Sequence, residues 1–179
     1  MHAITVTHLN PQDVLARAAG IAAIHQAAFD EADNDAANYR DVEIPEMAGY
    51  SGFACVIAET DEQMVGFAIG HDAAARPQWL QNVMTAVRDT PVRHWLPDAW
   101  YLADIAVLPD RQRGGIGRHM HDALMDLTSD RHRVLVTYHG AHPAKLFYRR
   151  LGWIEIVPDL AYAPGAPLTS LMMYAGRKP

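Results

Sequence analysis

Residues 100–127 read WYLADIAVLPDRQRGGIGRHMHDALMDL. The first nine are apolar except for Asp104, which predicts a buried β-strand over 100–108. Apolar residues then recur at helical spacing and predict an amphipathic helix from Ile116 to Leu127. Between them lies a short turn whose glycines let the backbone bend tightly and approach a ligand closely. This order of strand, turn and helix is the part of the sequence that decides the fold.

The turn also carries positive charge. Arg111, Arg113 and Arg118 surround the glycines, and no acidic residue lies between them. The N–H groups of a helix's first turn lack intrahelical acceptors and lie at the positive end of the helix dipole. Amides and guanidinium groups together predict a site for an anion such as a phosphate.

Two common phosphate-binding patterns do not fit this turn. A nucleoside-triphosphate loop requires Gly-Lys-Ser or Gly-Lys-Thr, whereas Gly117 is followed by Arg118 and His119. The dinucleotide pattern G-x-G-x-x-G requires a small residue where Met120 stands. A turn that only starts a helix would explain the glycines but not the arginines.

Periodicity elsewhere predicts strands over 4–9, 53–59, 64–70, 134–138, 153–157 and 168–174. It predicts helices over 11–29, 36–47, 77–88 and 143–151, the second of them interrupted by Pro45. Residues 89–98 and 158–167 are expected to be loops. This order predicts an α/β fold, with a mixed sheet and helices on both faces, in one domain over residues 1–179.

Composition narrows the class of protein. The chain has 179 residues, half of them hydrophobic, which suffices for one domain with a substantial core. Its 15 Lys and Arg residues against 21 Asp and Glu residues argue against general binding to nucleic acid. The single cysteine, Cys55, excludes a disulfide framework and a multi-thiolate zinc site, and we expect it to fill the core. Without a long apolar run or a start typical of a secretory signal, we expect a cytoplasmic protein with no membrane partner.

Two motifs resemble one known family. Residues 107–117, VLPDRQRGGIG, carry Gln112, Gly115 and Gly117 in a spacing that resembles the acetyl-coenzyme A signature of the GNAT superfamily of N-acetyltransferases. Residues 144–153, AKLFYRRLGW, are similar to the family's second hallmark, a helix that ends in Tyr-x-x-x-Gly-aromatic. Two departures concern the acceptor side: Ala141 stands where the family often has Asn, and the segment 73–99 is longer than in a plain member.

The resemblance implies a single domain with a mostly antiparallel sheet of about six or seven strands, whose splayed parallel pair holds acetyl-coenzyme A, and no metal. An amide near Val107 would polarise the thioester carbonyl. Tyr148 would protonate the departing thiolate as general acid. The residues that the resemblance implies for coenzyme binding are Ile105, Ala106, Val107, Gln112, Arg113, Gly114, Gly115, Ile116, Gly117, Arg118 and Tyr148.

The group that removes the acceptor's proton remains open between several residues. Asp104 is the one charge in an apolar strand, so it must be paired, solvated or functional. We expect it to orient the amine or to relay its proton through water, because family members that acetylate polyamines carry an acid at a similar position. A structural hydrogen bond to nearby backbone is the alternative role. His139 and Tyr138, after the next predicted strand, are the other candidates.

We therefore expect transfer of an acetyl group from acetyl-coenzyme A to a primary amine by direct attack in a ternary complex. The segment from Asp30 to Glu46 has seven acidic residues and one basic residue, which would suit a cationic acceptor. The alternatives are a non-catalytic coenzyme A-binding module and an O-acyltransferase on the same scaffold. Homodimers are common in the family, and Leu171, Met172 and Met173 could pack across one.

Overall fold

Strands β2 (Ala54–Thr60) and β3 (Gln63–Asp72) form the hairpin that the sequence predicts, in a computed structural model that describes residues 4–61, 63–161, 165 and 167–176. They pair antiparallel, with an irregularity between Ala58 and Glu59. Most of their residues are buried. A strand that is apolar on both faces requires cover on both faces, so this hairpin calls for helices on either side.

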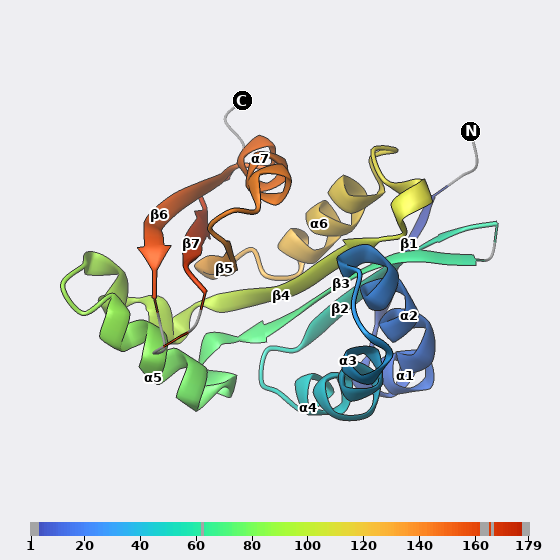
Figure 1. Cartoon of the computed structure of the whole chain (residues 1–179), viewed down its shortest axis with the longest axis horizontal. Coiled ribbons are helices and arrows are strands. Elements are labelled where there is room, and N and C mark those ends of the chain that lie inside the picture. Colours follow the sequence, from blue (N-terminus) through green and yellow to red (C-terminus); the bar gives the residue numbers. More distant parts are fainter. Residues whose placement is uncertain (1–3, 62, 162–164, 166, 177–179) are drawn as a thin grey trace. The chain divides into compact units, whose positions relative to one another are not determined.

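The strands are hydrogen-bonded in the order β1-β2-β3-β4-β5-β7-β6 (Figure 1). The other five strands are β1 (Thr5–Leu9), β4 (Trp100–Val107), β5 (Arg133–Tyr138), β6 (Trp153–Leu160) and β7 (Thr169–Tyr174). β4 and β5 pair in parallel, with Trp100 beside Arg133 and Tyr101 beside Val134. β1 with β2, β5 with β7 and β6 with β7 pair antiparallel. The predicted α/β class with a mixed sheet of six or seven strands is therefore confirmed.

Contacts along the chain divide it into two compact units. The first unit comprises Met1–His71 and Leu102–Ser129, and the second comprises Asp72–Tyr101 and Asp130–Pro179. Strand β4 thus begins in the second unit and continues into the first.

Helices cover both faces of the strands in the first unit (Figure 1). On one face, α1 (Pro11–Ala16), α2 (Ala18–Phe29) and α4 (Ile44–Ala48) form an apolar core with β2, β3 and β4. On the other face, α6 (Ile116–Asp126) packs against β1 and β2. The fully buried members of the core include Val14, Ile21, Ile44, Cys55, Ile57, Phe67 and Ile69. Cys55 therefore fills the core, as expected.

A glycine sets the distance between α6 and β3. A Cβ atom at Gly66 would lie 2.8 Å from Met120 Cε and 2.9 Å from the carbonyl oxygen of Ala106. The next residue, Phe67, belongs to the core on the opposite face, so Gly66 faces α6. Helix α6 can approach the sheet this closely because no side chain stands at Gly66.

The predicted continuous helix over 11–29 is wrong, because the chain forms two helices that are separated at Arg17. Arg17 has φ −106° and ψ 5°, outside the helical range, and its Nη1 lies 2.8 Å from Glu59 Oε1. The start is as predicted, because Asn10 Oδ1 accepts a hydrogen bond from the Asp13 N–H at 2.9 Å. Asp30, in the left-handed conformation with φ 56°, ends α2.

The acidic segment forms three consecutive helical pieces where one helix was predicted. They are α3 (Asp33–Asn38), a π-helical turn η1 (Tyr39–Glu43) and α4. Pro45 does not interrupt them because it lies in the first turn of α4, where a missing N–H breaks no intrahelical bond. The π turn buries Tyr39. Within the described part of the chain, no helix is both long and apolar enough to cross a membrane.

The second unit contains α5 (Pro77–Ala86) and α7 (His142–Arg150) with β5, β6 and β7. Residues 89–98 are not the irregular loop predicted, because Pro91–His94 and Leu96–Asp98 form 3₁₀ turns (η3 and η4), and a third, η2, spans Ala73–Ala75. Strand β6 extends three residues beyond its predicted end because Leu160 still pairs with Thr169. Pro158 is tolerated because β6 lies at the edge of the sheet. The rest of the predicted loop includes residues 162–164 and 166, which lie outside the described residues.

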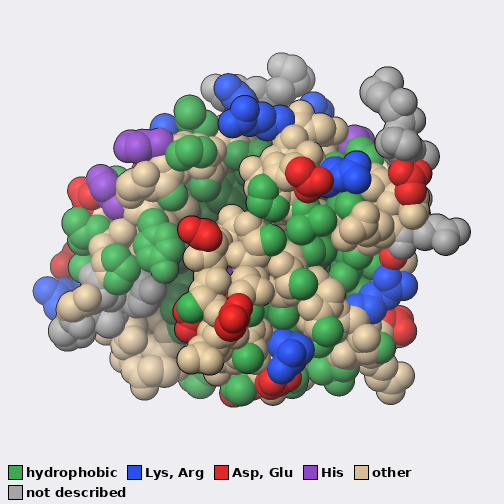
Figure 2. All heavy atoms as spheres, turned by 45° about the vertical axis from the view of Figure 1, so that its right-hand side comes forward, with side chains coloured by type: hydrophobic (Ala, Val, Ile, Leu, Met, Phe, Trp, Pro, Cys, Tyr) green, Lys and Arg blue, Asp and Glu red, His purple; other side chains and the backbone are tan. Residues whose placement is uncertain are grey.

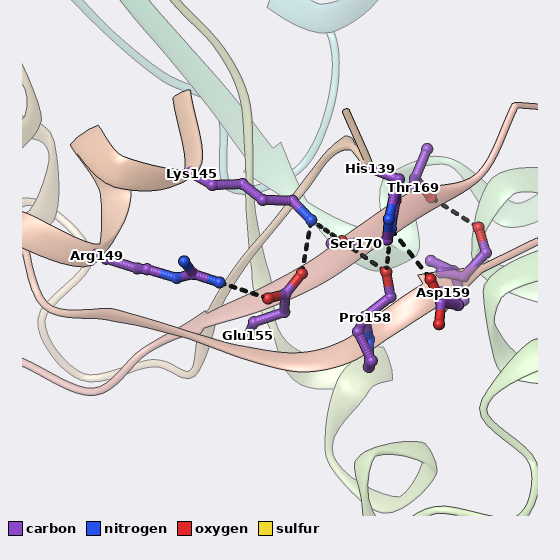
Figure 3. A network of polar contacts seen from close by, with 9 residues as sticks. His139, Lys145, Arg149, Glu155, Pro158, Asp159, Thr169 and Ser170 are labelled. Atoms are coloured by element: carbon purple, nitrogen blue, oxygen red, sulfur yellow. Dashed lines mark hydrogen bonds and ion pairs between the residues drawn. The ribbon is translucent and has the colours of Figure 1, made fainter. Parts of the chain in front are cut away.

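A buried lysine joins α7 to the strands of the second unit (Figure 3). Lys145 Nζ donates hydrogen bonds to Glu155 Oε1 at 2.7 Å and to Ser170 Oγ at 2.6 Å. Arg149 Nη2 donates to the other oxygen of Glu155 at 2.8 Å. The hydrogen bond from Lys145, with those from Ser170 and Arg149, outweighs burial and lowers the pKa of Glu155 to about 2. Glu155 is therefore an anion that the fold depends on.

Two of the three apolar residues expected at a dimer surface are buried within the chain itself. Strand β7 lies between β5 and β6. Leu171 and Met172 are fully buried within the chain, so these two side chains have no surface to present to a second copy.

We predict that Glu155→Gln lowers the free energy of unfolding at pH 7 by roughly 3 kcal/mol, because it leaves the Lys145 ammonium buried without its anion. The folded-state pKa of Glu155 is depressed, so its contribution is complete above its ordinary pKa of 4.5 and is lost as pH falls toward 2. Urea unfolding at several pH values should show the difference from wild type shrinking over that range. Asp89→Asn, which removes an exposed partner of Arg88, should change stability by less than about 0.5 kcal/mol. A difference that stays constant with pH would contradict this account.

Candidate functional site

The predicted anion-binding turn forms an exposed loop in front of α6. After β4, Pro109–Arg111 makes a 3₁₀ turn (η5), and residues 112–115 are exposed. Gln112 Nε2 donates a hydrogen bond to the Val107 carbonyl at 3.0 Å, which ties the loop to the end of β4. Gln112 therefore shapes the loop through its side chain.

Two residues of the loop adopt the left-handed conformation, Arg113 with φ 65° and Gly115 with φ 85°. The sequence predicted that glycines alone would form the bend, whereas one of its two left-handed residues is an arginine. Gly115 directly precedes α6, and its carbonyl accepts the His119 N–H at 3.1 Å. His119 Nδ1 lies 3.0 Å from the same carbonyl, so this nitrogen carries the proton and donates.

Amides and guanidinium groups are brought together at this point. Ile116, Gly117 and Arg118 form the first turn of α6, whose N–H groups have no intrahelical acceptors. Arg118 is 62% exposed and has only a loose ion pair with Asp122, at 3.7 Å. Such a cluster of oriented N–H groups and cationic side chains can hold a phosphate or pyrophosphate.

The end of β4 presents backbone groups on the side away from β3. The Leu108 N–H donates to the Val65 carbonyl of β3 at 2.9 Å. Because backbone groups alternate along an extended strand, the N–H groups of Val107 and Ile105 point to the opposite edge. The Val107 carbonyl also points away from β3, because it accepts the hydrogen bond from Gln112. Ile105 and Val107 can therefore hydrogen-bond to an extended ligand, while the side chain of Ala106 is buried in the core and its carbonyl lies beside Gly66 of β3.

Asp104 is paired through side chains that the sequence did not connect with it. Tyr39 Oη donates a hydrogen bond to Asp104 Oδ2 at 3.0 Å. His25 Nε2 lies 3.7 Å from Asp104 Oδ1, and His25 Nδ1 lies 2.8 Å from Glu31 Oε2. The predicted alternative, in which Asp104 accepts a hydrogen bond from nearby backbone, is replaced by contacts to His25 of α2 and Tyr39 of η1. We call His25, Glu31, Tyr39 and Asp104 the Asp104 cluster.

Burial and charge oppose each other in the Asp104 cluster. Burial lowers the pKa of His25, but Asp104 and Glu31 together raise it above its ordinary value of 6.5. Burial, with the charge of Asp104, raises the pKa of Tyr39 well above 10, so the phenol remains a hydrogen-bond donor. Burial also raises the pKa of the Cys55 thiol to about 12, which rules out a reactive thiolate here.

The remaining predicted residues belong to the second unit. Tyr148 is half-buried on α7, where its ring packs edge-on against Trp153 and beside Phe147. His139 Nδ1 lies 3.0 Å from Asp159 Oδ1 and 3.2 Å from the Pro158 carbonyl. Tyr138 is 64% exposed. Asp104 and the loop thus belong to the first unit, whereas Tyr138, His139 and Tyr148 belong to the second.

Sequence reasoning missed His25, Glu31 and Tyr39. His25 lies on the buried stripe of α2, and this position predicts core packing and nothing more specific. The sequence around His25 did hold a usable signal, because an acid follows six residues after this histidine near the end of an apolar helix. The two side chains can meet if the chain reverses direction between them. Asp30 makes that reversal.

Comparison with known proteins gives the family. The model of the acetyltransferase (GNAT) family matches residues 18–153, so the chain belongs to this family. No curated protein sequence matches the chain significantly.

Solved structures agree on the fold. An acetyltransferase assigned to the GNAT family from Desulfovibrio desulfuricans has a TM-score of 0.64 at 21% identity, over 96% of this chain and 97% of that one. A protein named histone acetyltransferase HPA2 and related acetyltransferase, from Corynebacterium glutamicum, has a TM-score of 0.66 at 17% identity, over 100% and 99%. The PaiA N-acetyltransferase of Thermoplasma acidophilum, solved in complex with coenzyme A, has a TM-score of 0.60 at 12% identity, over 94% and 98%.

The loop's backbone gives a matched pair of substitutions. Gly115→Ala should lower the free energy of unfolding by about 1–2 kcal/mol, because an L side chain is strained at this φ although the Cβ itself would have room, 3.8 Å from His119 Cε1. Gly114→Ala should cost nothing or stabilise by up to about 1 kcal/mol, because Gly114 is not left-handed and its Cβ would meet the Arg111 carbonyl at an ordinary 3.6 Å. Urea unfolding of both variants checks this, and equal effects would refute the assignment of strain to Gly115.

Proposed function

We propose that this protein transfers an acetyl group from acetyl-coenzyme A to a primary amine by direct attack within a ternary complex. The observation that carries the proposal is the Gln112–Arg118 loop at the start of α6, with its left-handed residues, exposed arginines and free first-turn amides. Membership of the acetyltransferase (GNAT) family supports it, since the family uses acetyl-coenzyme A as its donor.

The loop would hold the pyrophosphate of the coenzyme. Arg113, Gly115, Gly117 and Arg118 would supply amides and positive charge, with Gly114 and Ile116 completing the backbone. The N–H groups of Ile105 and Val107 point away from β3, which suits pairing with the amides of an extended pantetheine arm. The Val107 N–H would then polarise the thioester carbonyl and stabilise the oxyanion that forms there.

Two side chains would move protons. A lysine-like amine has a pKa near 10.4, so at neutral pH it arrives as an ammonium that must lose a proton before it attacks. Asp104, whose side chain is 25% exposed, would receive that proton. Tyr148 would donate a proton to the departing coenzyme thiolate.

The acceptor would be a cationic amine that is recognised by a few separate carboxylates and not by a continuous acidic surface. In the acidic segment, Asp41 binds Arg40 at 2.6 and 2.7 Å, and Glu43 accepts a hydrogen bond from Asn38 at 2.9 Å. Figure 2 shows acidic side chains standing apart on the face that it draws, with basic side chains among them. Recognition of the acceptor's charge would therefore rest on a few positioned groups, Asp104 first among them.

Coenzyme binding is testable without knowledge of the acceptor. By calorimetry at moderate salt, we expect wild type to bind acetyl-coenzyme A, and Arg113→Asn and Arg118→Gln each to weaken binding about tenfold, because each removes a charge-assisted contact. Asn tolerates the left-handed conformation of residue 113, so the loop's shape is retained. Arg88→Gln, an exposed change in the second unit, is the control and should bind like wild type. Absence of binding by wild type would end the proposal.

Turnover separates an enzyme from a binding module. With a panel of amines and acetyl-coenzyme A, release of free thiol should be observed, and Tyr148→Phe should lower kcat about 100-fold while coenzyme affinity is retained. Tyr50→Phe, which removes a phenol hydroxyl that donates to Glu46 Oε2 at 3.4 Å, is the matched control. Undiminished turnover in Tyr148→Phe would remove Tyr148 from the acid role, and binding without turnover would favour the non-catalytic module.

A further inference from the structure

The imidazole of His25 lies buried between two carboxylates, and the activity proposed above does not yet use it. Its side chain is 10% exposed, whereas those of Asp104 and Glu31 are 25% and 26% exposed. Nδ1 faces Glu31 at 2.8 Å and Nε2 faces Asp104 at 3.7 Å. A buried ionisable ring joined to the surface on both sides by acids can exchange protons without being exposed itself.

The chain fixes this arrangement from several elements. Asp30 reverses the chain at the end of α2, and the Glu31 N–H then donates to the Gln26 carbonyl at 3.2 Å. Gln26 Nε2 also holds Asp33 at 2.8 Å. The ring of Tyr39 stacks on the imidazole, with centroids 3.8 Å apart and planes at 14°. The imidazole therefore cannot turn away from either carboxylate without breaking these contacts.

Both ionisable and apolar side chains pack against the imidazole. Glu31 follows α2, Tyr39 comes from η1 and Asp104 from β4, while Phe29 and Phe67 supply apolar ring contacts. Electrostatic interactions with Cys55 and Glu43 also raise the pKa of Tyr39. The thiol of Cys55 and the phenol of Tyr39 remain neutral at physiological pH. The charged groups that face the ring are thus the two carboxylates.

The two ring nitrogens have different tasks. An ionised Glu31 can only accept hydrogen bonds, so Nδ1 at 2.8 Å carries a proton permanently. Titration of the ring therefore takes place at Nε2, the nitrogen that faces Asp104. The 3.7 Å gap exceeds a hydrogen bond, but a small rotation of the partly exposed Asp104 side chain closes it.

We propose that the proton of the acceptor amine passes through Asp104 to Nε2 of His25, and that Glu31 is the positioning residue that governs how strongly the ring holds it. This rests on the proposed acetyl transfer. An N–H bond of the ammonium breaks, its electron pair stays on nitrogen for attack on the thioester, and the proton binds an oxygen of Asp104. The O–H bond then breaks as Nε2–H forms, and the resulting imidazolium lies between two carboxylates. After the products leave, the proton returns through Asp104 to water.

A purely structural role for His25 makes a different prediction. If the ring only packs between α2 and β4, its ionisation leaves the rate unchanged. If it stores the proton, the acid limb of kcat/KM follows the ring's own pKa in every variant. Because the carboxylates raise that pKa, the wild-type limb should lie above pH 6.5.

The test compares the pH dependence of kcat/KM, followed by thiol release with one amine, with an NMR titration of labelled histidine, the His25 signal being assigned by its loss in His25→Gln. Glu31→Gln keeps an acceptor on Nδ1 but removes the charge, so the NMR pKa and the acid limb should both fall by roughly one pH unit. His25→Gln should lower kcat about tenfold or more and abolish that limb. Asp104→Asn should also lower kcat although His25 still titrates.

Controls and outcomes keep the inference separate from the proposed function. His8→Gln and Asp126→Asn, both exposed in the first unit, should leave the acid limb in place. If His25→Gln does not fold, the near-isosteric Glu31→Gln carries the test, with the His25 signal assigned by correlation of its ring with its own backbone resonances. An active enzyme whose acid limb does not move with the NMR pKa would overturn this inference and leave the proposed function standing. Failure to acetylate any amine would overturn both.

Discussion

The charge of Asp104 in an otherwise apolar strand is the constraint on which the first unit depends. A bare carboxylate among β3, β4 and α2 would be costly, so the chain must supply partners for it. It does so with the Tyr39 hydroxyl at 3.0 Å and the His25 ring at 3.7 Å. The π turn that buries Tyr39 and the reversal at Asp30 that returns Glu31 to His25 both serve this group. Residues 30–48 thus place Tyr39 against Asp104 and Glu31 against His25.

Much of the site could be predicted because its chemistry is local in sequence. The loop from Gln112 to Arg118 lies between a strand and a helix whose periodicities are clear, so the position of this loop follows from the order of elements alone. What the pattern could not show is which residues bend. Glycines favour left-handed backbone, yet Arg113 adopts it and Gly114 does not. The tether from Gln112 to the Val107 carbonyl restrains the backbone on one side of Arg113, and such tertiary restraints override local preference.

The Asp104 cluster could not be predicted because its members are distant in sequence and occupy positions that carry no distinctive pattern. Tyr39 and Asp104 are separated by 65 positions, and His25 occupies a position on α2 that any apolar residue could fill. The break at Arg17 and the π turn at η1 set the angles of these helices, and neither leaves a periodic signal. Sequence reasoning found the charge that needed a partner and could not find the partner.

The pairing of a carboxylate with a buried imidazole also resolves a mismatch of basicity. A carboxyl with an ordinary pKa near 4 is a weak base for an ammonium with a pKa near 10, so a proton would return to the amine far faster than it stayed on the acid. An imidazole whose pKa is raised by two anions lies between these values. The step onto Asp104 would stay unfavourable, but onward transfer to His25 is favourable and would remove the proton before it returns to the amine. In the proposed relay, the partly exposed carboxylate would reach the substrate, and the buried ring would supply the affinity for the proton that the carboxylate lacks.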